Sequence, residues 1–448
     1  MIFKKRAHYM VECKILKKMK NITKLKPPTV WNKVYACALI ANFLLCVSLF
    51  MVNPLVANYA KLLGADEVMI GVLSGLYFGV AFAARPFSGP AIAMLNKKRI
   101  MLFAYTTGVI VNLGYAISSD IPVFMAARIL HGLEFAFVGS LNMTLASESL
   151  PAGKMGSGLA IFGVSGATAN AIAPSIGLAL RSWGEQTFGG LKQGYTVVYI
   201  VAAACMLISI IPCVVMPYVK PSRETLSRLG AWYKNIFAKE ALMPTIVITF
   251  LAVSVISYTI YMERFAEANG IGNIGLFFTV YAVALVASRP ISGKLIDKYG
   301  ITKVFVPGAF LFALSFVIIG FSNSLGMILV GAVIAAIGLG SSQPTIQTMS
   351  LLSVNPLRYG VASNTVYFGI DFGNFLGPIV AGLIINSYGF LNDFRLSDEY
   401  AITFSPLYLA MIAPVFLAMI IFMFSLGAYK RNAMKAREAQ AAVSSDSP

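Results

Sequence analysis

The chain is poor in charge. Only 12% of its 448 residues are Asp, Glu, Lys or Arg, whereas ordinary globular domains carry about 25% charged residues. Hydrophobic residues make up 58% of the chain, and a chain of this composition cannot cover itself with polar surface. The composition therefore excludes an ordinary soluble domain and predicts a membrane protein.

Motifs for covalent and metal chemistry are also scarce. The two histidines and five cysteines form no zinc-binding pattern, and no CxxC pair occurs. Gly153-Lys154 and Gly293-Lys294 lack the glycine spacing and the following Ser or Thr of a phosphate-binding loop. No nucleophile has a histidine partner nearby in sequence. We therefore expect no enzyme activity, no metal and no cofactor.

Long apolar segments recur along the chain. A helix needs roughly 20 apolar residues to cross the hydrocarbon core of a bilayer. The first run is too long for a signal-peptide core and no small-residue cleavage site follows it, so we expect it to remain as a span. Twelve charge-poor segments are predicted to cross the membrane: 34–60, 68–95, 100–118, 122–146, 158–180, 196–218, 242–262, 274–296, 304–322, 326–352, 361–387 and 403–428.

The basic residues test this assignment, because Lys and Arg concentrate on the cytoplasmic side of membrane proteins. Of the 35 basic residues, 26 lie in the segments that the assignment places inside, and five lie in the outer loops. Both termini are therefore predicted to be cytoplasmic. We assign the net charge of +17 to orientation and to contact with anionic lipids, and expect no nucleic-acid partner.

The chain contains an internal repeat. Residues 70–89 and 274–293 align without a gap at an offset of 204 residues, and the shared letters include Gly71/Gly275, Tyr77/Tyr281, Arg85/Arg289, Pro86/Pro290 and Gly89/Gly293. A repeat of this length in an apolar chain indicates two related membrane halves with a site between them. The predicted fold is an all-α membrane protein whose twelve transmembrane helices form two pseudo-symmetric six-helix bundles.

The repeat and the charge pattern divide the chain into five parts. We expect a basic cytoplasmic arm, a first bundle, a cytoplasmic linker with an amphipathic helix on the membrane surface, a second bundle and a cytoplasmic tail. None of the three parts outside the bundles can bury a core of its own. The predicted bounds are 1–33, 34–218, 219–241, 242–428 and 429–448.

Three motifs carry a family resemblance. Residues 289–303 place Gly293 and Asp297 four apart, followed by basic residues and Gly300. Residues 128–132 read Arg-Ile-Leu-His-Gly, and Gly373, Gly377 and Pro378 form a Gly-x-x-x-Gly-Pro pattern. Together they resemble the major facilitator superfamily of transporters, in particular its bacterial branch of drug and sugar exporters.

The resemblance implies a gate at the cytoplasmic face. It assigns gating to Gly293, Asp297 and Gly300, with Arg289 and the repeat mates Arg85 and Gly89. Asp297 is expected to hold a neighbouring helix end, through a basic residue or a helix N-terminus. We expect both arginines to extend towards the inner face and order the gate, in preference to touching substrate.

The first half departs from the family pattern. The offset places Ala93 where a second aspartate would stand, so the latch is expected to be stronger in the second half. The Gly-Pro motif, with Gly373, Gly377 and Pro378 as helix-packing residues, lies in span eleven, and its counterpart in span five is weak. Efflux by exchange for protons is still favoured, with proton-coupled import as the nearest alternative.

Ionisable residues deep in the spans are costly and tend to face water or a partner. The candidates for proton coupling are Arg128, His131 and Glu134 in span four and Asp371 in span eleven. Glu134 could instead form a buried pair with His131 or Arg128 that only ties helices together. His131 is expected to serve as a structural hydrogen-bonding residue, and for Asp371 the functional and structural interpretations carry equal weight.

The resemblance makes spans one, four, seven and ten the lining of a central cavity. Asn42, Asn53, Tyr258 and Gln343 are the candidate substrate contacts, although polar residues between membrane helices commonly serve only to hold them together.

The predicted function is secondary transport by alternating access, with export of a drug, sugar or other small organic solute in exchange for protons. A proton-coupled importer is the nearest alternative. The second alternative is a non-transporting receptor or scaffold with the same fold. The expected partners are a small-molecule substrate and the lipid bilayer. The protein is expected to act as a monomer in the plasma membrane of a bacterium.

Overall fold

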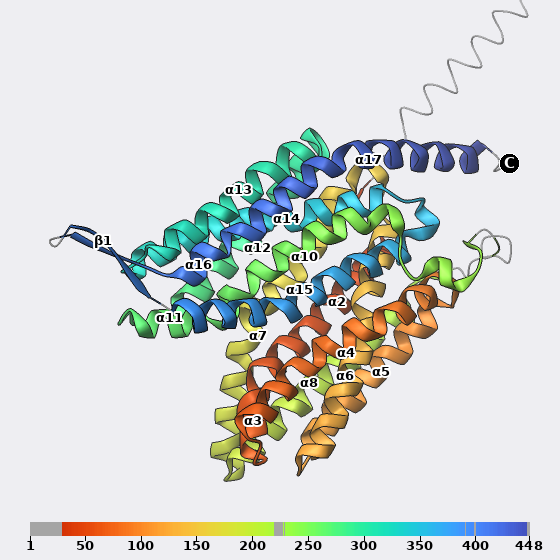
Figure 1. The fold of residues 1–448 in the computed structure, drawn as a ribbon. Helices are drawn as coiled ribbons and strands as arrows, with labels where there is room; N and C mark the ends of the chain where they lie inside the picture. The colour runs from red at the N-terminus through yellow and green to blue at the C-terminus, as the bar shows by residue number, and fades with distance from the viewer. Residues whose placement is uncertain (1–28, 219–226, 228, 390, 398–399, 446–448) are drawn as a thin grey trace, which may run out of the picture.

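A computed structural model of the chain describes residues 29–218, 227, 229–389, 391–397 and 400–445. Most of the basic arm and the first part of the linker lie outside the described residues. The amphipathic helix is expected across 220–241, of which the structure describes 227 and 229–241. Nearly all of the described chain is helical (Figure 1).

Twelve long helices build the described chain, six in each bundle. The first bundle holds α2 (Lys33–Val52), α4 (Glu67–Met94), α5 (Lys97–Ile117), α6 (Ile121–Glu148), α7 (Met155–Phe188) and α8 (Leu191–Val215). The second holds α10 (Leu242–Ile260), α12 (Gly275–Tyr299), α13 (Ile301–Gly320), α14 (Leu325–Leu352), α15 (Tyr359–Tyr388) and α17 (Ile412–Ser445). Shorter helices are η1 (Asn53–Leu55), α3 (Val56–Leu62), η2 (Ala152–Lys154), α11 (Met262–Ala268), η5 (Pro356–Arg358) and α16 (Pro406–Ala410).

The helices have the length and composition of membrane spans. In the described chain, 11 helical segments are long and apolar enough to cross a bilayer, and α4, with 28 residues, is the twelfth long helix. The predicted class, an all-α membrane protein built from two six-helix bundles, is confirmed.

The internal repeat is visible in the helix bounds. The helix α6 covers 121–148 and α14 covers 325–352, so both ends are offset by 204 residues. Their N-caps correspond as well: Asp120 accepts a hydrogen bond from the Val123 amide at 2.9 Å, and Ser324 accepts one from the Met327 amide at 3.4 Å. Capping side chains of this kind satisfy amides that the first helical turn leaves unpaired.

Two features at the C-terminal side differ from the sequence-based expectation. A β-hairpin of β1 (Asn392–Ser397) and β2 (Tyr400–Phe404) occupies a segment expected to be a plain outer loop, with Asn392 opposite Phe404. It breaks the offset of 204 between α8 and α17. In addition, α17 continues to Ser445, so most of the expected tail is an extension of the last helix.

The linker lies at one end of the molecule, which we call the linker end. Its described part forms two short turns, η3 (Trp232–Asn235) and η4 (Lys239–Ala241). The amide of Ala238 donates to Thr365 Oγ1 of α15 at 3.0 Å, which ties the linker to the second bundle. The opposite end carries the β-hairpin, and we call it the hairpin end.

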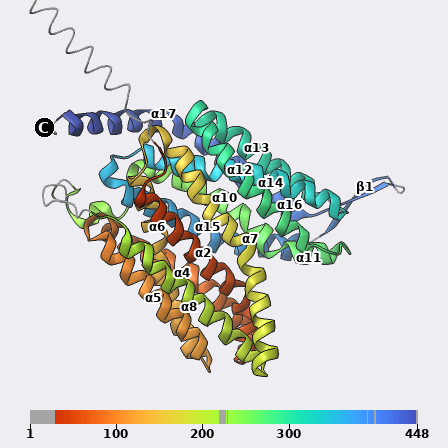
Figure 2. The same cartoon turned by 180° about the vertical axis from the view of Figure 1, so that it is seen from behind.

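The two bundles meet at the linker end and diverge from it. Figure 1 and Figure 2 show the first bundle, in orange to yellow-green, and the second, in green to blue, separating towards α3 and β1. Each bundle has its own aromatic core, around Tyr59 in the first and Tyr258 in the second. The surfaces on which the bundles touch are therefore the natural place to look for a site.

Candidate functional site

Two seams join the bundles. In one, α7 of the first bundle packs against α12 of the second, and in the other α15 of the second packs against α4 of the first. The repeat relates them, because α7 corresponds to α15 and α12 to α4 at the offset of 204. We call them the α7–α12 seam and the α4–α15 seam.

The α7–α12 seam is closed at the linker end by Asp297. Its carboxylate accepts hydrogen bonds from the backbone amides of Gly156 at 2.9 Å and Ser157 at 3.0 Å, and from the Ser157 hydroxyl. These amides belong to the first turn of α7, where the helix dipole and the unpaired N–H groups favour a negative charge. Asp297 thus holds a helix N-terminus of the other bundle.

Glycines allow the seams to close tightly. A β-carbon on Gly293 would lie 2.6 Å from the β-carbon of Ala160, and one on Gly89 would lie 2.7 Å from Nδ2 of Asn364. At either position, a residue larger than glycine would fit only if the neighbouring atoms moved. Gly300, which separates α12 from α13, has a φ of 83°, a conformation that glycine adopts without strain.

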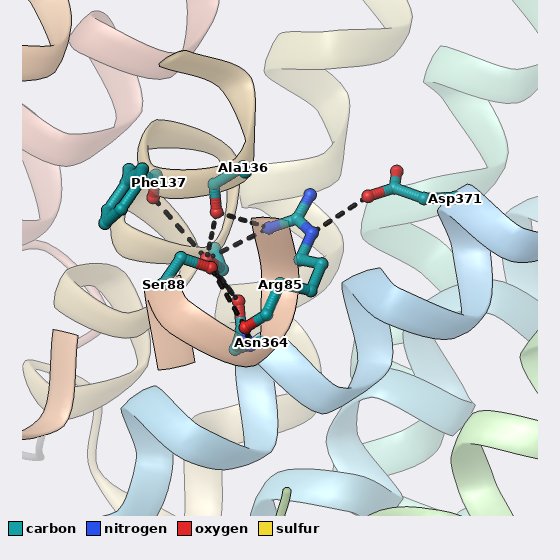
Figure 3. A network of polar contacts seen from close by, with 7 residues as sticks. Arg85, Ser88, Ala136, Phe137, Asn364 and Asp371 are labelled. Atoms are coloured by element: carbon teal, nitrogen blue, oxygen red, sulfur yellow. Dashed lines mark hydrogen bonds and ion pairs between the residues drawn. The ribbon is translucent and has the colours of Figure 1, made fainter. Parts of the chain in front are cut away.

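Arg85 forms the centre of the α4–α15 seam (Figure 3). Its Nε lies 2.8 Å from Oδ2 of Asp371, and the side chains are 0% and 1% exposed. Its Nη1 donates to the Ala136 carbonyl at 2.8 Å and to Ser140 Oγ at 3.1 Å. The ion pair ties α4 to α15, so the expectation that Arg85 extends to the inner face is wrong.

Asn364 of α15 extends this network towards the linker end. Its Nδ2 donates to the Arg85 carbonyl at 2.7 Å, and its Oδ1 accepts from Ser88 Oγ at 2.7 Å and from Ser140 Oγ at 3.3 Å (Figure 3). Asn364 was not among the predicted site residues. Its repeat mate is Ala160, so neither the repeat nor the family motifs point to it.

Arg289, the repeat mate of Arg85, has different surroundings. It is 8% exposed, which again contradicts an extension to the inner face. Its Nη2 donates to Oε1 of Gln343 at 2.9 Å, so Gln343, a candidate substrate contact, is hydrogen-bonded to this arginine. Across the seam, a β-carbon on Gly163 would lie only 1.6 Å from Nη1. Within the described residues, Arg289 has no ion-pair partner.

Arg128 stays within the first bundle. Its Nε donates to the Leu73 carbonyl at 3.0 Å, and its Nη2 donates to the Ser74 carbonyl at 3.1 Å. Its Nη1 donates to Oδ1 of Asn53 at 3.4 Å, and the guanidinium lies 5.4 Å from the ring centroid of Tyr77. Arg128 and Asn53 are thus brought together, while Glu134 is not among the partners of Arg128.

Glu134 and His131 lie deeper in the same bundle. His131 Nδ1 lies 3.0 Å from the Tyr115 hydroxyl, in agreement with a structural hydrogen bond. Glu134 is 3% exposed and its two carboxylate oxygens have no hydrogen-bond partner in the described chain. A β-carbon on Gly108 of α5 would lie 3.5 Å from Glu134 Oε1. The suggested buried pair of Glu134 with His131 or Arg128 is not formed.

Two candidate substrate contacts are turned into their own bundles. Asn42 donates to Ser165 Oγ at 2.8 Å, between α2 and α7. Tyr258 bonds with Ser315 Oγ of α13 at 2.5 Å, and its ring stacks on Phe316 at 4.6 Å. The side chain of Tyr258 therefore belongs to the aromatic core of the second bundle, which does not favour a role as a substrate contact.

The Gly-Pro motif of α15 packs against α10. A β-carbon on Gly373 would lie 2.6 Å from the β-carbon of Ala252, and Gly377 is buried. The carbonyl of Pro378 accepts a hydrogen bond from the Tyr261 hydroxyl at 3.1 Å. This contact lies within the second bundle, which agrees with a packing role.

Comparisons with known proteins agree with this architecture. The family model described as "Major Facilitator Superfamily" matches residues 38–272 and 242–446. The multidrug resistance protein MdtG of Salmonella schwarzengrund (strain CVM19633) is 26% identical over 378 residues, which cover 81% of this chain and 91% of that protein.

Two solved transporters have the same fold. The transporter FucP in its outward conformation superposes with a TM-score of 0.68 at 13% identity, covering 89% of this chain and 99% of FucP. The proton:xylose symporter XylE, bound to 6-bromo-6-deoxy-D-glucose, gives a TM-score of 0.69 at 11% identity, covering 88% of this chain and 95% of XylE. With two paired bundles, an internal repeat and a family model that matches both halves, this chain belongs to the Major Facilitator Superfamily.

Proposed function

We propose that the protein is a secondary active transporter that exports a small organic solute by alternating access, with protons as the coupling ion. One observation carries the proposal. The contacts that hold the bundles together, from Asp297 through Gly293 and Gly89 to Arg85, all lie in the part of the seams towards the linker end. The bundles diverge towards the hairpin end (Figure 1).

This arrangement supports a gate at the linker end that opens when the seams part. Release of the first turn of α7 by Asp297, together with separation of Arg85 from Asp371, would let the bundles rock about their interface. The site between the halves would then face the other side of the membrane, as expected for a protein built from two related halves.

The direction and the location rest on the sequence and on the relatives. The concentration of basic residues at the termini and in alternate loops supports a cytoplasmic location for both termini and the linker end. MdtG is named a multidrug resistance protein, which favours export from a bacterial cell. We expect a monomer in the plasma membrane.

We assign proton coupling to Glu134. An ionised carboxylate buried without a donor costs several kcal/mol, so Glu134 can carry a charge only in a state that supplies water or a donor. Arg128 and His131 lie one to two helical turns away on α6 and can respond to such a change. Asp371, in contrast, already has Arg85 as its partner, and we assign it to the closure of the seam.

Glu134→Gln tests this assignment. Inside-out membrane vesicles with an imposed proton gradient would be screened for accumulation of labelled organic solutes. The variant is expected to lose at least about tenfold of the gradient-driven accumulation, while it keeps the parental elution volume and melting temperature. The matched control is Glu267→Gln, which removes a carboxylate from an exposed position. A Glu134→Gln variant that accumulates solute like the parent would overturn the coupling role.

A further inference from the structure

Arg289 is a buried cation without a counter-charge in the described chain. Its guanidinium has one side-chain acceptor, Oε1 of Gln343, which is neutral, and its Nε has no hydrogen-bond partner. Arginine does not give up its proton in proteins. A buried charge that lacks a partner is costly, so a negative group that completes this site would bind favourably.

The repeat identifies the missing group. Asp371, which pairs with Arg85, corresponds at the offset of 204 to Ala167 of α7. Ala167 is buried and packs with core residues of the second bundle, so it lies at the α7–α12 seam. The position that supplies a carboxylate to Arg85 therefore supplies only a methyl group to Arg289.

A second difference is that Arg289 lacks an aromatic cover across the seam. The guanidinium of Arg85 lies 5.0 Å from the ring centroid of Tyr367. The repeat mate of Tyr367 is Gly163, the residue against which Nη1 of Arg289 lies. One arginine is thus covered by an aromatic ring and a carboxylate, while the other faces glycine and alanine.

The opposite arginine also keeps an unused donor. Nη2 of Arg85 is buried without a hydrogen-bond partner. Tyr281 lies eight residues before Arg289 on α12, and so on nearly the same face of that helix, while Tyr367 of α15 lies beside Arg85. The site therefore combines an excess of positive charge with aromatic surface contributed by the second bundle.

We infer that the transported solute is an organic anion whose carboxylate, sulfonate or phosphonate group binds Arg289 in the place of the carboxylate missing at Ala167. A planar guanidinium binds such groups through two parallel hydrogen bonds. The aromatic or apolar part of the solute lies towards Tyr281 and Tyr367. This inference rests on the proposed transport function and names its substrate class.

An anionic substrate also fits the proposed direction. A membrane potential that is negative inside contributes about 2.3 kcal/mol per 100 mV for each charge that crosses. It drives anions out of the cell and protons in. Exchange of an internal anion for an external proton would therefore gain free energy from both movements.

Binding of three matched probes tests the substrate class. Naphthoate, naphthylmethanol and naphthylmethylamine share an aromatic body and differ in charge. Titrated against the purified full chain in lipid nanodiscs, naphthoate is expected to bind about 10- to 100-fold more tightly than the alcohol. Arg289→Gln should abolish this preference. Lys294→Gln, which removes an exposed positive charge from the same helix, should retain it.

A second pair of variants addresses the missing carboxylate directly. Ala167→Asp should supply a counter-charge to Arg289 and lower the affinity for naphthoate by at least about tenfold. Ala167→Asn has the same size without the charge and should leave the preference for naphthoate over the alcohol in place. Equal loss in the two variants would mean that bulk alone acts, and would overturn the inference.

Transport of the same probes separates this inference from the proposed function. If naphthoate binds through Arg289 but no proton gradient moves any probe, the transport proposal fails and the anion site stands. If a proton gradient moves naphthylmethylamine or the alcohol while naphthoate does not bind, transport stands and the anion inference is overturned.

Discussion

The two seams between the bundles are related by the repeat and yet closed by different chemistry. In the α4–α15 seam, a buried ion pair between Arg85 and Asp371 ties the bundles together deep in the interface. In the α7–α12 seam, the carboxylate is that of Asp297, and it holds the first turn of α7 at the linker end. In each seam, a carboxylate of one bundle contacts the other bundle, but the two contacts lie at different depths.

This difference shows how a symmetric framework can separate two tasks. The repeat mates of Asp371 and Asp297 are Ala167 and Ala93, so each carboxylate is present once. The carboxylate in the α4–α15 seam neutralises its arginine. The carboxylate in the α7–α12 seam is used at the linker end, and it leaves Arg289 free for an incoming group.

The largest effect is expected from Asp371→Asn. This change leaves Arg85 buried with neutral partners only, and removal of one member of a buried ion pair typically costs about 3–5 kcal/mol. In the other seam, Gln343→Leu removes a neutral acceptor from Arg289, which should cost about 1–3 kcal/mol. Thermal unfolding of the two variants in the same detergent compares the seams.

A double variant controls for the loss of charge. Replacement of both members of a buried pair by apolar residues of similar size is often nearly neutral, so Arg85→Met with Asp371→Leu should unfold closer to the parent than Asp371→Asn alone. Equal melting temperatures for Asp371→Asn and Gln343→Leu would contradict the difference between the seams.

The sequence predicts the part of this comparison that depends on short-range pattern. The apolar segments 122–146 and 326–352 locate α6 and α14, and the loop motif identifies Asp297 as a latch, with a helix N-terminus as one of its two expected partners. Both can be found from the order of residues alone, without knowledge of which side chains meet in space. The hairpin from Asn392 to Phe404 was missed because it is a short polar segment between two spans, where a loop is the usual outcome.

The contacts of Arg85 could not be predicted in the same way. Its partner Asp371 lies 286 positions away, and a repeat argument treats Arg85 and Arg289 alike, although their environments differ. The orientation of Tyr258 was also out of reach. The helix α10 is largely apolar, so its sequence pattern does not show that Tyr258 turns towards Ser315 of α13.

An intermediate effect is expected from Asp297→Asn. The loss of charge weakens three hydrogen bonds to the start of α7, and hydrogen bonds to charged groups are worth about 1.5–3 kcal/mol. The equilibrium should therefore shift about 10- to 100-fold towards an open linker end. Spin labels at the exposed residues Arg99 and Lys303, one in each bundle, would report the change as a longer distance.

The control for this experiment is Asp393→Asn in the hairpin. Asp393 accepts a hydrogen bond from Thr403 at 2.9 Å, far from the linker end, and its loss should leave the distance between the labels unchanged. If Asp297→Asn also left the distance unchanged, closure of the α7–α12 seam would not depend on the contact at the α7 N-terminus.

The smallest effect is expected from Glu240→Gln, which removes the ion pair at the start of α15. Arg358 Nη1 lies 3.1 Å from Glu240 Oε2, and the two side chains are 26% and 36% exposed. Such pairs contribute about 0–1 kcal/mol and weaken in high salt.

The repeat mate of Arg358 is Lys154, which has no ion-pair partner in the described part of the chain, so this pair is a further difference between the seams. The distance between the same two spin labels, measured at low and high salt, compares the effect of Glu240→Gln with that of Asp297→Asn. A shift as large as that of Asp297→Asn would mean that the linker end is held by charges at its rim, and that the contact of the Asp297 carboxylate with α7 is not what distinguishes the two seams.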